Sequence, residues 1–278
     1  MHPFTRAKPV VMAKYGYLEA FMNDLRSSGR YAFSLSELRN KFDQSDEAIK
    51  KALQRLKNKG ELAAIRKEFY VVISPEYRSK GILPPSLFID ALMKFLEKKY
   101  YVGLLNAAAY HGAAHQQPQS FSVIIGKPGL RDIHNDKLKL NFYLKKEWQT
   151  DFIIQKKVDT GYINISSPEL TAIDLVYYFE HVGGMNRVVT VLDELCESMD
   201  ADKLLALVKV YAPKSAVQRL GFLLEQILQK RNLSDPIKRY LKTVNIYPIL
   251  LKPQSERQEM ISGNAWKVVQ NLEIETDL

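Results

Sequence analysis

The chain has 278 residues, 46% of them hydrophobic, which is enough for two domains of ordinary size with cores of their own. Its single cysteine, Cys196, excludes an intramolecular disulfide framework and any metal site built from several cysteines. The sequence has no apolar run of membrane-spanning length, and its start, MHPFTRAKPVVMAK, does not resemble a signal peptide, so we expect a cytoplasmic protein without membrane contact.

The positive charge is concentrated near the start of the chain. The formal net charge is +9, and residues 1–80 contain 16 Lys and Arg against 9 Asp and Glu, an excess of seven. The remaining 198 residues have 24 against 22, an excess of only two. A basic excess confined to one small region indicates a nucleic-acid partner rather than a general aid to solubility.

Two helices are predicted before residue 43. The first follows from the helical spacing of Leu18, Phe21, Met22 and Leu25, with Gly29 placed to end it in a left-handed conformation. The second begins at Ser34, which stands three residues before Glu37 as in a capping box, and its buried positions are Leu35, Leu38 and Phe42.

The third predicted helix, from Ser45 to Gly60, has the composition of a DNA-recognition helix. Ser45 or Asp46 can cap it, and its apolar positions are Ile49, Ala52, Leu53 and Leu56. The opposite face carries Glu47, Lys50, Lys51, Gln54, Arg55, Lys57 and Asn58. Amides can read adenine edges, and basic side chains can read guanine or neutralise phosphates.

A small hairpin follows this helix directly. LAAIR and FYVVI are extended segments joined by a basic tip, Arg66-Lys67-Glu68. Three helices and a hairpin predict a winged helix-turn-helix that binds double-stranded DNA. We expect major-groove contacts from Lys50, Lys51, Gln54, Arg55 and Asn58, and phosphate contacts from Arg66 and Lys67. A merely solvated lysine-rich face, or a winged helix that binds protein, is the alternative.

The stretch SPEYRSKGILPPS separates this region from a larger neutral one. We therefore expect a DNA-binding domain over residues 1–76, a linker over 77–85 and a second domain over 86–278. In the second domain, two helices precede strands at SFSVIIGK, KLKLNFYLKK, DFIIQKKV and GYINIS, and a helical run to about Val244 precedes a last strand at NIYPILL. Such an order predicts an α+β fold, with a helix capped by Ser167 and ended by Gly183-Gly184.

Three segments of this second domain carry a resemblance to a known family. YYVGLLNAAAYHGAAHQQPQSFSVII, SSPELTAIDLVYYFEHVGG and QRLGFLLE, in this order behind a winged helix, resemble the AbiEi-type antitoxins of bacterial abortive-infection toxin–antitoxin systems. The resemblance runs over nearly the whole chain. One departure is at the hairpin tip, where the family often has an Arg-Gly pair and this chain has Arg66-Lys67-Glu68, so that Glu68 would repel phosphate.

The resemblance implies a transcriptional repressor of its own operon that needs no cofactor. Such a protein binds inverted repeats upstream of an antitoxin–toxin gene pair, and its C-terminal domain counters a nucleotidyltransferase-like toxin without a stable complex. Because one winged helix covers one half-site, a monomer or weak dimer would place two copies on the operator.

The sequence gives little support to an enzymatic function, so we expect a protein that is not an enzyme. The sequence contains no phosphate-binding loop, dinucleotide fingerprint, nucleophile elbow or zincin motif. A nuclease reading rests on Gln155-Lys156-Lys157 behind Asp132 or Asp136, which is short of the carboxylates that Mg²⁺ requires. His111 and His115 are four residues apart without a third ligand, so packing is the better explanation and no metal site is expected.

Two further hypotheses concern the second domain. The amphipathic segment Lys214 to Asn232 could bind a partner protein and make the chain an adaptor, although burial within its own domain is the simpler explanation; Gln218, Glu225, Gln229 and Lys230 are expected on its polar face. Asp174, within an apolar stripe, is expected to be a buried acid paired with Arg187 or Arg219.

Overall fold

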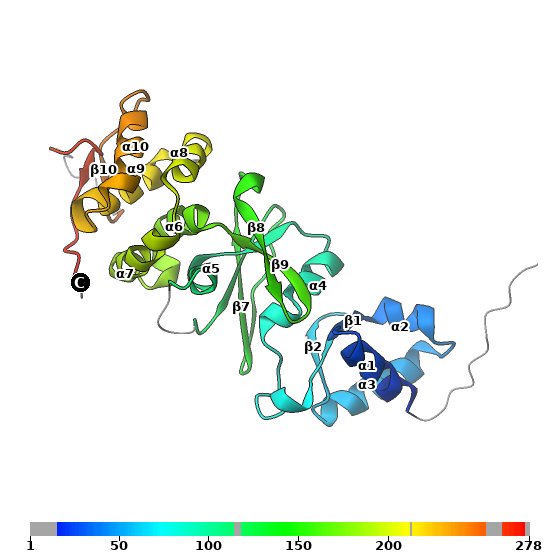
Figure 1. Ribbon diagram of the computed structural model, residues 1–278. Coiled ribbons are helices and arrows are strands. Elements are labelled where there is room, and N and C mark those ends of the chain that lie inside the picture. Colours follow the sequence, from blue (N-terminus) through cyan, green and yellow to red (C-terminus); the bar gives the residue numbers. More distant parts are fainter. Residues whose placement is uncertain (1–15, 114–117, 212, 254–262, 276–278) are drawn as a thin grey trace, which may run out of the picture. The chain divides into compact units, whose positions relative to one another are not determined.

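The structure is a computed structural model that describes residues 16–113, 118–211, 213–253 and 263–275 (Figure 1). The chain divides into two compact units. The first comprises residues 1–98, 133–139 and 157–163, and the second comprises 99–132, 140–156 and 164–278. The sequence suggests a linker at 77–85, whereas the first unit continues to Lys98, because α4 (Ile89–Phe95) packs on β1 and the rings of Phe95 and Phe69 lie 5.2 Å apart.

The first unit begins with three helices and three strands, in the order α1 (Tyr17–Ser27), β1 (Ala32–Ser34), α2 (Leu35–Lys41), α3 (Asp46–Asn58), β2 (Leu62–Arg66) and β3 (Phe69–Val72). The predicted helix ends are confirmed. Ser34 Oγ accepts from the Glu37 amide and Ser45 Oγ from the Ala48 amide, so each hydroxyl satisfies an orphan donor of its helix. Gly29 follows α1 with a φ of 71°, which glycine adopts without strain.

The predicted apolar positions of these helices form one core. The three strands pair antiparallel in the order β1-β3-β2, with Phe33 opposite Tyr70 and their rings stacked at 5.6 Å. The core contains the buried side chains Leu18, Phe21, Met22, Leu25, Phe33, Leu35, Leu38, Ile49, Ala52, Leu53, Leu56, Leu62 and Val72. Two short 3₁₀ helices, Pro75–Tyr77 and Pro85–Leu87, then lead to α4.

A six-stranded sheet follows α4 along the chain, with its strands in the order β6-β7-β5-β4-β9-β8. Its strands are β4 (Tyr100–Val102), β5 (Phe121–Ile125), β6 (Ile133–Asn135), β7 (Leu138–Leu144), β8 (Ile153–Val158) and β9 (Gly161–Ser166). The four strands predicted from the sequence are present, but β4 and β6 were not predicted. β4 pairs antiparallel with β5 and parallel with β9, so three residues join both halves of the sheet.

Most helices of this part of the chain follow the sheet in sequence, as expected, and one lies between its first two strands. They are α5 (Leu104–Tyr110), between β4 and β5, and then α6 (Pro168–Tyr177), α7 (Met185–Leu195), α8 (Ala201–Val210), α9 (Lys214–Phe222) and α10 (Arg231–Leu241), with 3₁₀ turns at Thr150–Phe152, Phe179–Val182 and Cys196–Ser198. Ser167 Oγ accepts from the Leu170 amide at the start of α6, as predicted.

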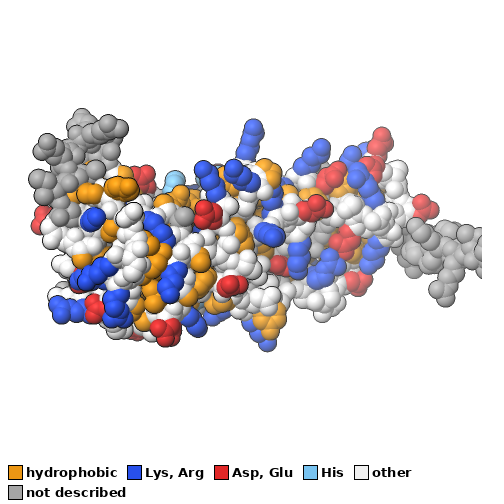
Figure 2. Space-filling model, turned by 90° about the horizontal axis from the view of Figure 1, so that it is seen from above, with side chains coloured by type: hydrophobic (Ala, Val, Ile, Leu, Met, Phe, Trp, Pro, Cys, Tyr) orange, Lys and Arg blue, Asp and Glu red, His pale blue; other side chains and the backbone are white. Residues whose placement is uncertain are grey.

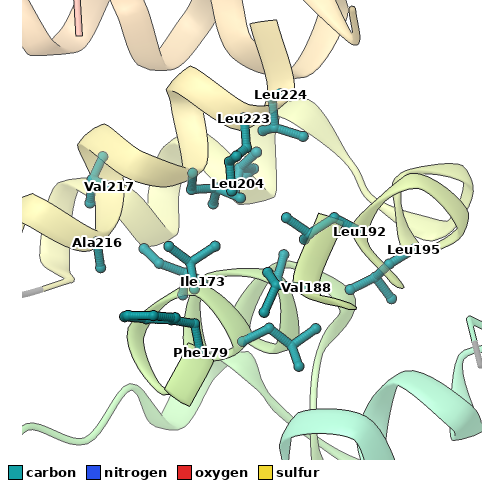
Figure 3. Close-up of a cluster of buried hydrophobic side chains, with 14 of the residues drawn as sticks. Ile173, Phe179, Val188, Leu192, Leu195, Leu204, Ala216, Val217, Leu223 and Leu224 are labelled. Carbon is teal, nitrogen blue, oxygen red and sulfur yellow. The ribbon is translucent and has the colours of Figure 1, made fainter. Parts of the chain in front are cut away.

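The helices share one large apolar core, part of which is drawn in Figure 3. In that view Ile173, Val188 and Leu192 face Leu204, Val217 and Leu223 across the helical layer. A π-helical turn, Leu223–Ile227, continues α9, and the predicted last strand is reduced to β10 (Ile249–Leu250), which pairs parallel with β11 (Val268–Val269).

The described residues therefore form a mixed α+β fold, which confirms the expected class at that level. Within the same residues, none of the helices is both long enough and apolar enough to cross a membrane.

Candidate nucleic-acid interface

The polar face of α3 is exposed, while its apolar stripe lies in the core. Ile49, Ala52, Leu53 and Leu56 are at most 6% exposed. The five side chains predicted to enter the major groove are all exposed: Lys50, Lys51, Gln54, Arg55 and Asn58. Amphipathic spacing thus fixes the rotation of the helix and leaves its basic and amide side chains on the surface.

A shallow groove brings part of this face together with the β2–β3 hairpin. It has a volume of about 430 Å³. Its polar lining includes Lys50 and Gln54 of α3 and Arg66 and Lys67 of the hairpin. Three of the predicted cations and one predicted amide, at most 17 positions apart in the chain, therefore lie around one concave surface.

The remaining predicted residues lie elsewhere on the helix. Arg55 lines a second groove, of about 290 Å³, with residues of α1. Lys51 and Asn58 line neither groove, but Gln54 Nε2 donates a hydrogen bond of 2.9 Å to Asn58 Oδ1. The seven predicted residues are thus spread across the exposed face of α3 and the hairpin rather than gathered at a single point.

Lys57 is a groove residue that the sequence-based selection left out. It is exposed and lines the groove beside Lys50 and Gln54. Its position seven residues after Lys50 was the available signal, because seven residues are almost two full helical turns.

The two basic residues of the hairpin differ in exposure. Lys67 is exposed, whereas Arg66 is half-buried, and burial lowers the pKa of its guanidinium. Glu68, the other turn residue, has a φ of 63° and its carboxylate lies 3.7 Å from Arg39 Nη1. Arg39 also makes two hydrogen bonds to Asp46, at 2.8 and 2.6 Å. Arg39 therefore offsets the negative charge of Glu68 that the sequence suggested would repel phosphate.

Surface charge alone does not single out this site. Figure 2 shows many lysine and arginine side chains on one face of the molecule, with acidic side chains among them. The distinguishing feature is the combination of concavity, cations and amides at α3 and the hairpin.

Asp174 is a buried acid, as expected, but the predicted partners are wrong. Its carboxylate is fully buried and accepts hydrogen bonds from Tyr101 Oη at 2.6 Å, Tyr211 Oη at 2.7 Å and Lys145 Nζ at 2.7 Å. Burial and the adjacent carboxylate raise the pKa of both tyrosines well above the ordinary value. This cluster ties α6 to the sheet, and each of its polar groups is hydrogen-bonded to another member.

The QRLGFLLE motif holds the C-terminal segment. Gln218, expected on a polar face, is 2% exposed and donates to the carbonyls of Tyr247 and Trp266 at 2.9 and 2.8 Å. Arg219 Nε donates to the carbonyls of Leu250 and Leu251. These contacts satisfy backbone groups of β10 and its neighbours.

The apolar side of the same motif is buried in its own unit. Val217, Leu220 and Leu224 are fully buried, which confirms the simpler explanation for this segment and leaves the adaptor hypothesis without its amphipathic surface.

The nuclease and metal-site hypotheses also lack the cluster of ligand side chains that each would need. Gln155, Lys156 and Lys157 are exposed on β8, and Asp132 Oδ1 accepts from the Phe142 amide at 2.7 Å. No group of three or more His, Cys, Asp or Glu that could hold a metal ion occurs in the part of the chain that the structure describes. His111 Nε2 donates to the Ser166 carbonyl at 2.8 Å, and His115 lies outside the described residues.

Comparison with solved structures finds a protein of similar fold. The protein is similar to the RV2827C protein from Mycobacterium tuberculosis, with a TM-score of 0.66 at 15% identity, over 95% of this chain and 94% of that one. At this identity the likeness concerns the fold alone. An antigenic nucleotidyltransferase-like protein from Paracoccidioides brasiliensis is similar over 54% of this chain and 88% of that one, with 11% identity and a TM-score of 0.33, too low to support an argument.

Comparison with protein families identifies the part of the chain that contains the sheet and the helices α5 to α9. No curated protein matches the sequence. Residues 101–226 match the family model of the AbiEi antitoxin C-terminal domain. They include the sheet, α5 to α9 and most of the three segments on which the resemblance was stated. The resemblance to the AbiEi-type antitoxins is therefore confirmed at the level of this domain: the chain carries an AbiEi antitoxin C-terminal domain.

Proposed function

We propose that this protein is an AbiEi-type antitoxin and a DNA-binding autorepressor of its toxin–antitoxin operon, and that it has no enzymatic activity. In this proposal residues 16–72 are a winged helix-turn-helix, in which α3 enters the major groove and the β2–β3 hairpin is the wing. The C-terminal domain counters a nucleotidyltransferase-like toxin, and the protein acts in the cytoplasm.

The groove between α3 and the hairpin carries this proposal. Lys50, Lys57 and Lys67 supply charge along its rim, and Gln54 supplies a neutral donor and acceptor between them. Duplex DNA requires this division, because cations neutralise phosphates while amides recognise base edges. The core of a protein–protein interface is depleted of charged residues, whereas the exposed face of α3 is mostly charged.

Two copies would act on one operator. One recognition helix covers one half-site, and inverted repeats present two half-sites related by a two-fold axis. The copies would therefore bind as a weak dimer formed on the DNA.

The test is a fluorescence-anisotropy titration of the full-length protein against the DNA upstream of its own gene, with a scrambled duplex as control. At two salt concentrations we expect tighter binding to the upstream DNA and a steep loss of affinity as salt rises, because binding releases condensed counterions. Equal, weak binding to both duplexes would reduce the first unit to a general basic surface and contradict the proposal.

Single substitutions refine the same titration. Lys57→Ala and Lys67→Ala should each weaken binding to every duplex and lower the salt slope by about one, because each removes one phosphate contact. Lys94→Ala is the matched control: this exposed lysine of α4 pairs with Asp90 at 2.7 Å and lines neither groove, so its loss should leave the slope unchanged.

A further inference from the structure

The middle of the exposed face of α3 is occupied by two amides rather than by cations. At 100° per residue, Gln54 and Asn58 lie at the centre of the polar arc. Lys50 and Lys57 flank them on one side, and Lys51 and Arg55 flank them on the other. Glu47 shares the central arc but stands seven residues before Gln54, about 10 Å away along the helix axis.

This order matches the cross-section of a major groove. The flanks of a helix in the groove face the two phosphate backbones, while its centre faces the base edges. Cations on both flanks and amides in the centre therefore assign phosphate contacts to the lysines and Arg55, and base contacts to the amides.

The two amides are joined to each other. Gln54 Nε2 donates to Asn58 Oδ1 at 2.9 Å, and both side chains are exposed. The glutamine amide has two N–H donors and one acceptor oxygen. With one donor directed at Asn58, Gln54 retains Oε1 and its second N–H for a ligand. These two groups form a pair of one acceptor and one donor with a fixed direction.

We infer that Gln54 reads the adenine of an A·T base pair at a defined position of each half-site, and that Asn58 is a positioning residue that orients the Gln54 amide. Oε1 accepts from adenine N6, and the free Nε2–H donates to adenine N7, the acceptor–donor pattern that adenine presents in the major groove. The inference rests on the proposed DNA-binding function, and it adds the base that is recognised and the residue that selects it.

Neighbouring side chains are less suited to this role. Lys50 Nζ lies 3.6 Å from Asp46 Oδ2, which holds it toward the start of the helix, and Arg66 is half-buried. Gln54 is the uncharged polar side chain of α3 that lines the groove, so it can approach a base edge without being drawn to the phosphates.

The experiment measures the affinity of the full-length protein for its upstream operator and for duplexes in which each base pair of one half-site is replaced in turn. At one position the native protein should prefer A·T by about 5- to 150-fold, the range of a good bidentate contact. Gln54→Glu should change this preference to C·G at the same position, because a carboxylate accepts from cytosine N4 and cannot donate to adenine N7.

The positioning role has its own pair of variants. Asn58→Leu removes the acceptor for Gln54 and should lower the A·T preference several-fold, whereas Asn58→Asp keeps an acceptor and should preserve the preference even if its charge weakens binding to every duplex. Gln54 and Asn58 are both on the surface, so the thermal melting temperatures of these variants should be unchanged.

The outcomes separate the inference from the function on which it rests. If the native protein binds the operator selectively but Gln54→Glu weakens every duplex by the same factor, the assignment of Gln54 is wrong and the DNA-binding function stands. If the native protein does not distinguish the operator from scrambled DNA, the DNA-binding function and this inference both fail. Equal preferences in Asn58→Leu and the native protein would remove only the role of Asn58.

Discussion

Asp174 stands at the centre of three buried polar side chains, Tyr101, Lys145 and Tyr211, from distant parts of the chain. Lys145 Nζ lies 2.7 Å from its carboxylate and 3.0 Å from Tyr101 Oη, and the exposed fractions of the Lys145 and Asp174 side chains are 6% and 0%. A buried charge is tolerated only when it is paired and hydrogen-bonded, and here each member satisfies another.

Removal of this carboxylate should be costly. Asp174→Ala leaves the Lys145 ammonium without its counter-charge and two tyrosine hydroxyls without an acceptor, so we expect a loss of about 3–5 kcal/mol in the free energy of unfolding, measured by urea denaturation. Asp193→Ala, which breaks the more exposed pair with Lys230, should cost at most about 1 kcal/mol. DNA affinity of the folded fraction should be unchanged; a loss of affinity without destabilisation would contradict a structural role.

His111 should make the stability of the protein depend on pH. Burial lowers the pKa of its imidazole and the nearby Lys156 acts in the same direction, while the hydrogen bond to the Ser166 carbonyl opposes them. The folded state therefore takes up the histidine proton less readily than the unfolded chain does. The contribution of neutral His111 to stability is full above the unfolded pKa of 6.5 and is lost as pH falls below it.

Urea denaturation of His111→Asn between pH 7.5 and 5 tests this dependence. The native protein should lose stability over this range more steeply than the variant does. His134→Asn replaces an exposed histidine and should retain the native slope. Parallel curves for the native protein and His111→Asn would show that another group sets the dependence.

At the scale of elements, α9 depends on a glycine that helix propensity alone would disfavour. Glycine in a helix costs about 0.5–1 kcal/mol relative to alanine. A Cβ at Gly221, however, would meet Trp266 Cζ3 at 1.9 Å, and Trp266 is fully buried with its indole N–H donating to Glu225. The helix accepts the glycine because the indole ring packs directly on its backbone.

Gly221→Ala should therefore destabilise the protein although it raises helix propensity. We expect a loss of about 1–3 kcal/mol, the usual cost of overpacking, read from the thermal or urea unfolding transition. In a Trp266→Leu background the same change should cost less, because the smaller side chain leaves room for the methyl group. If Gly221→Ala costs the same in both backgrounds, contact with Trp266 is not the source of the strain.

At the scale of the whole molecule, the basic excess and the family domain fall in different parts of the sequence. Residues 1–80 carry an excess of seven positive charges, and the AbiEi antitoxin domain spans residues 101–226. DNA binding and antitoxicity should therefore be separable by substitution.

The double variant Lys57→Glu/Lys67→Glu tests this separation. Expressed from a foreign promoter, it should lose DNA affinity more than about tenfold, because two cations of the groove become anions, and should still restore growth of cells that express the neighbouring toxin. Lys94→Glu should retain both properties. Loss of protection by a folded double variant would show that the groove also takes part in antitoxicity.

The sequence by itself determined what depends on near neighbours. Ser34, Ser45 and Ser167 cap their helices through amides three residues away, and the apolar stripe of α3 fixes which of its side chains are exposed. Spacing within a few residues encodes such features, because the helix repeats every 3.6 residues. The predicted strands β5, β7, β8 and β9 follow from the same kind of local pattern. The DNA contacts chosen from that pattern stay a prediction.

Only the tertiary structure decided which distant groups meet. Tyr101, Lys145 and Tyr211 reach Asp174 from positions 73, 29 and 37 residues away, whereas the sequence suggested Arg187 or Arg219. Strand β4 is three residues long and is extended because it pairs with β5 and β9. Gln218 is buried because its amide donates to the carbonyl of Trp266, 48 residues later. Contacts across such separations leave no period in the sequence, since they depend on how complete elements pack rather than on the spacing within any one of them.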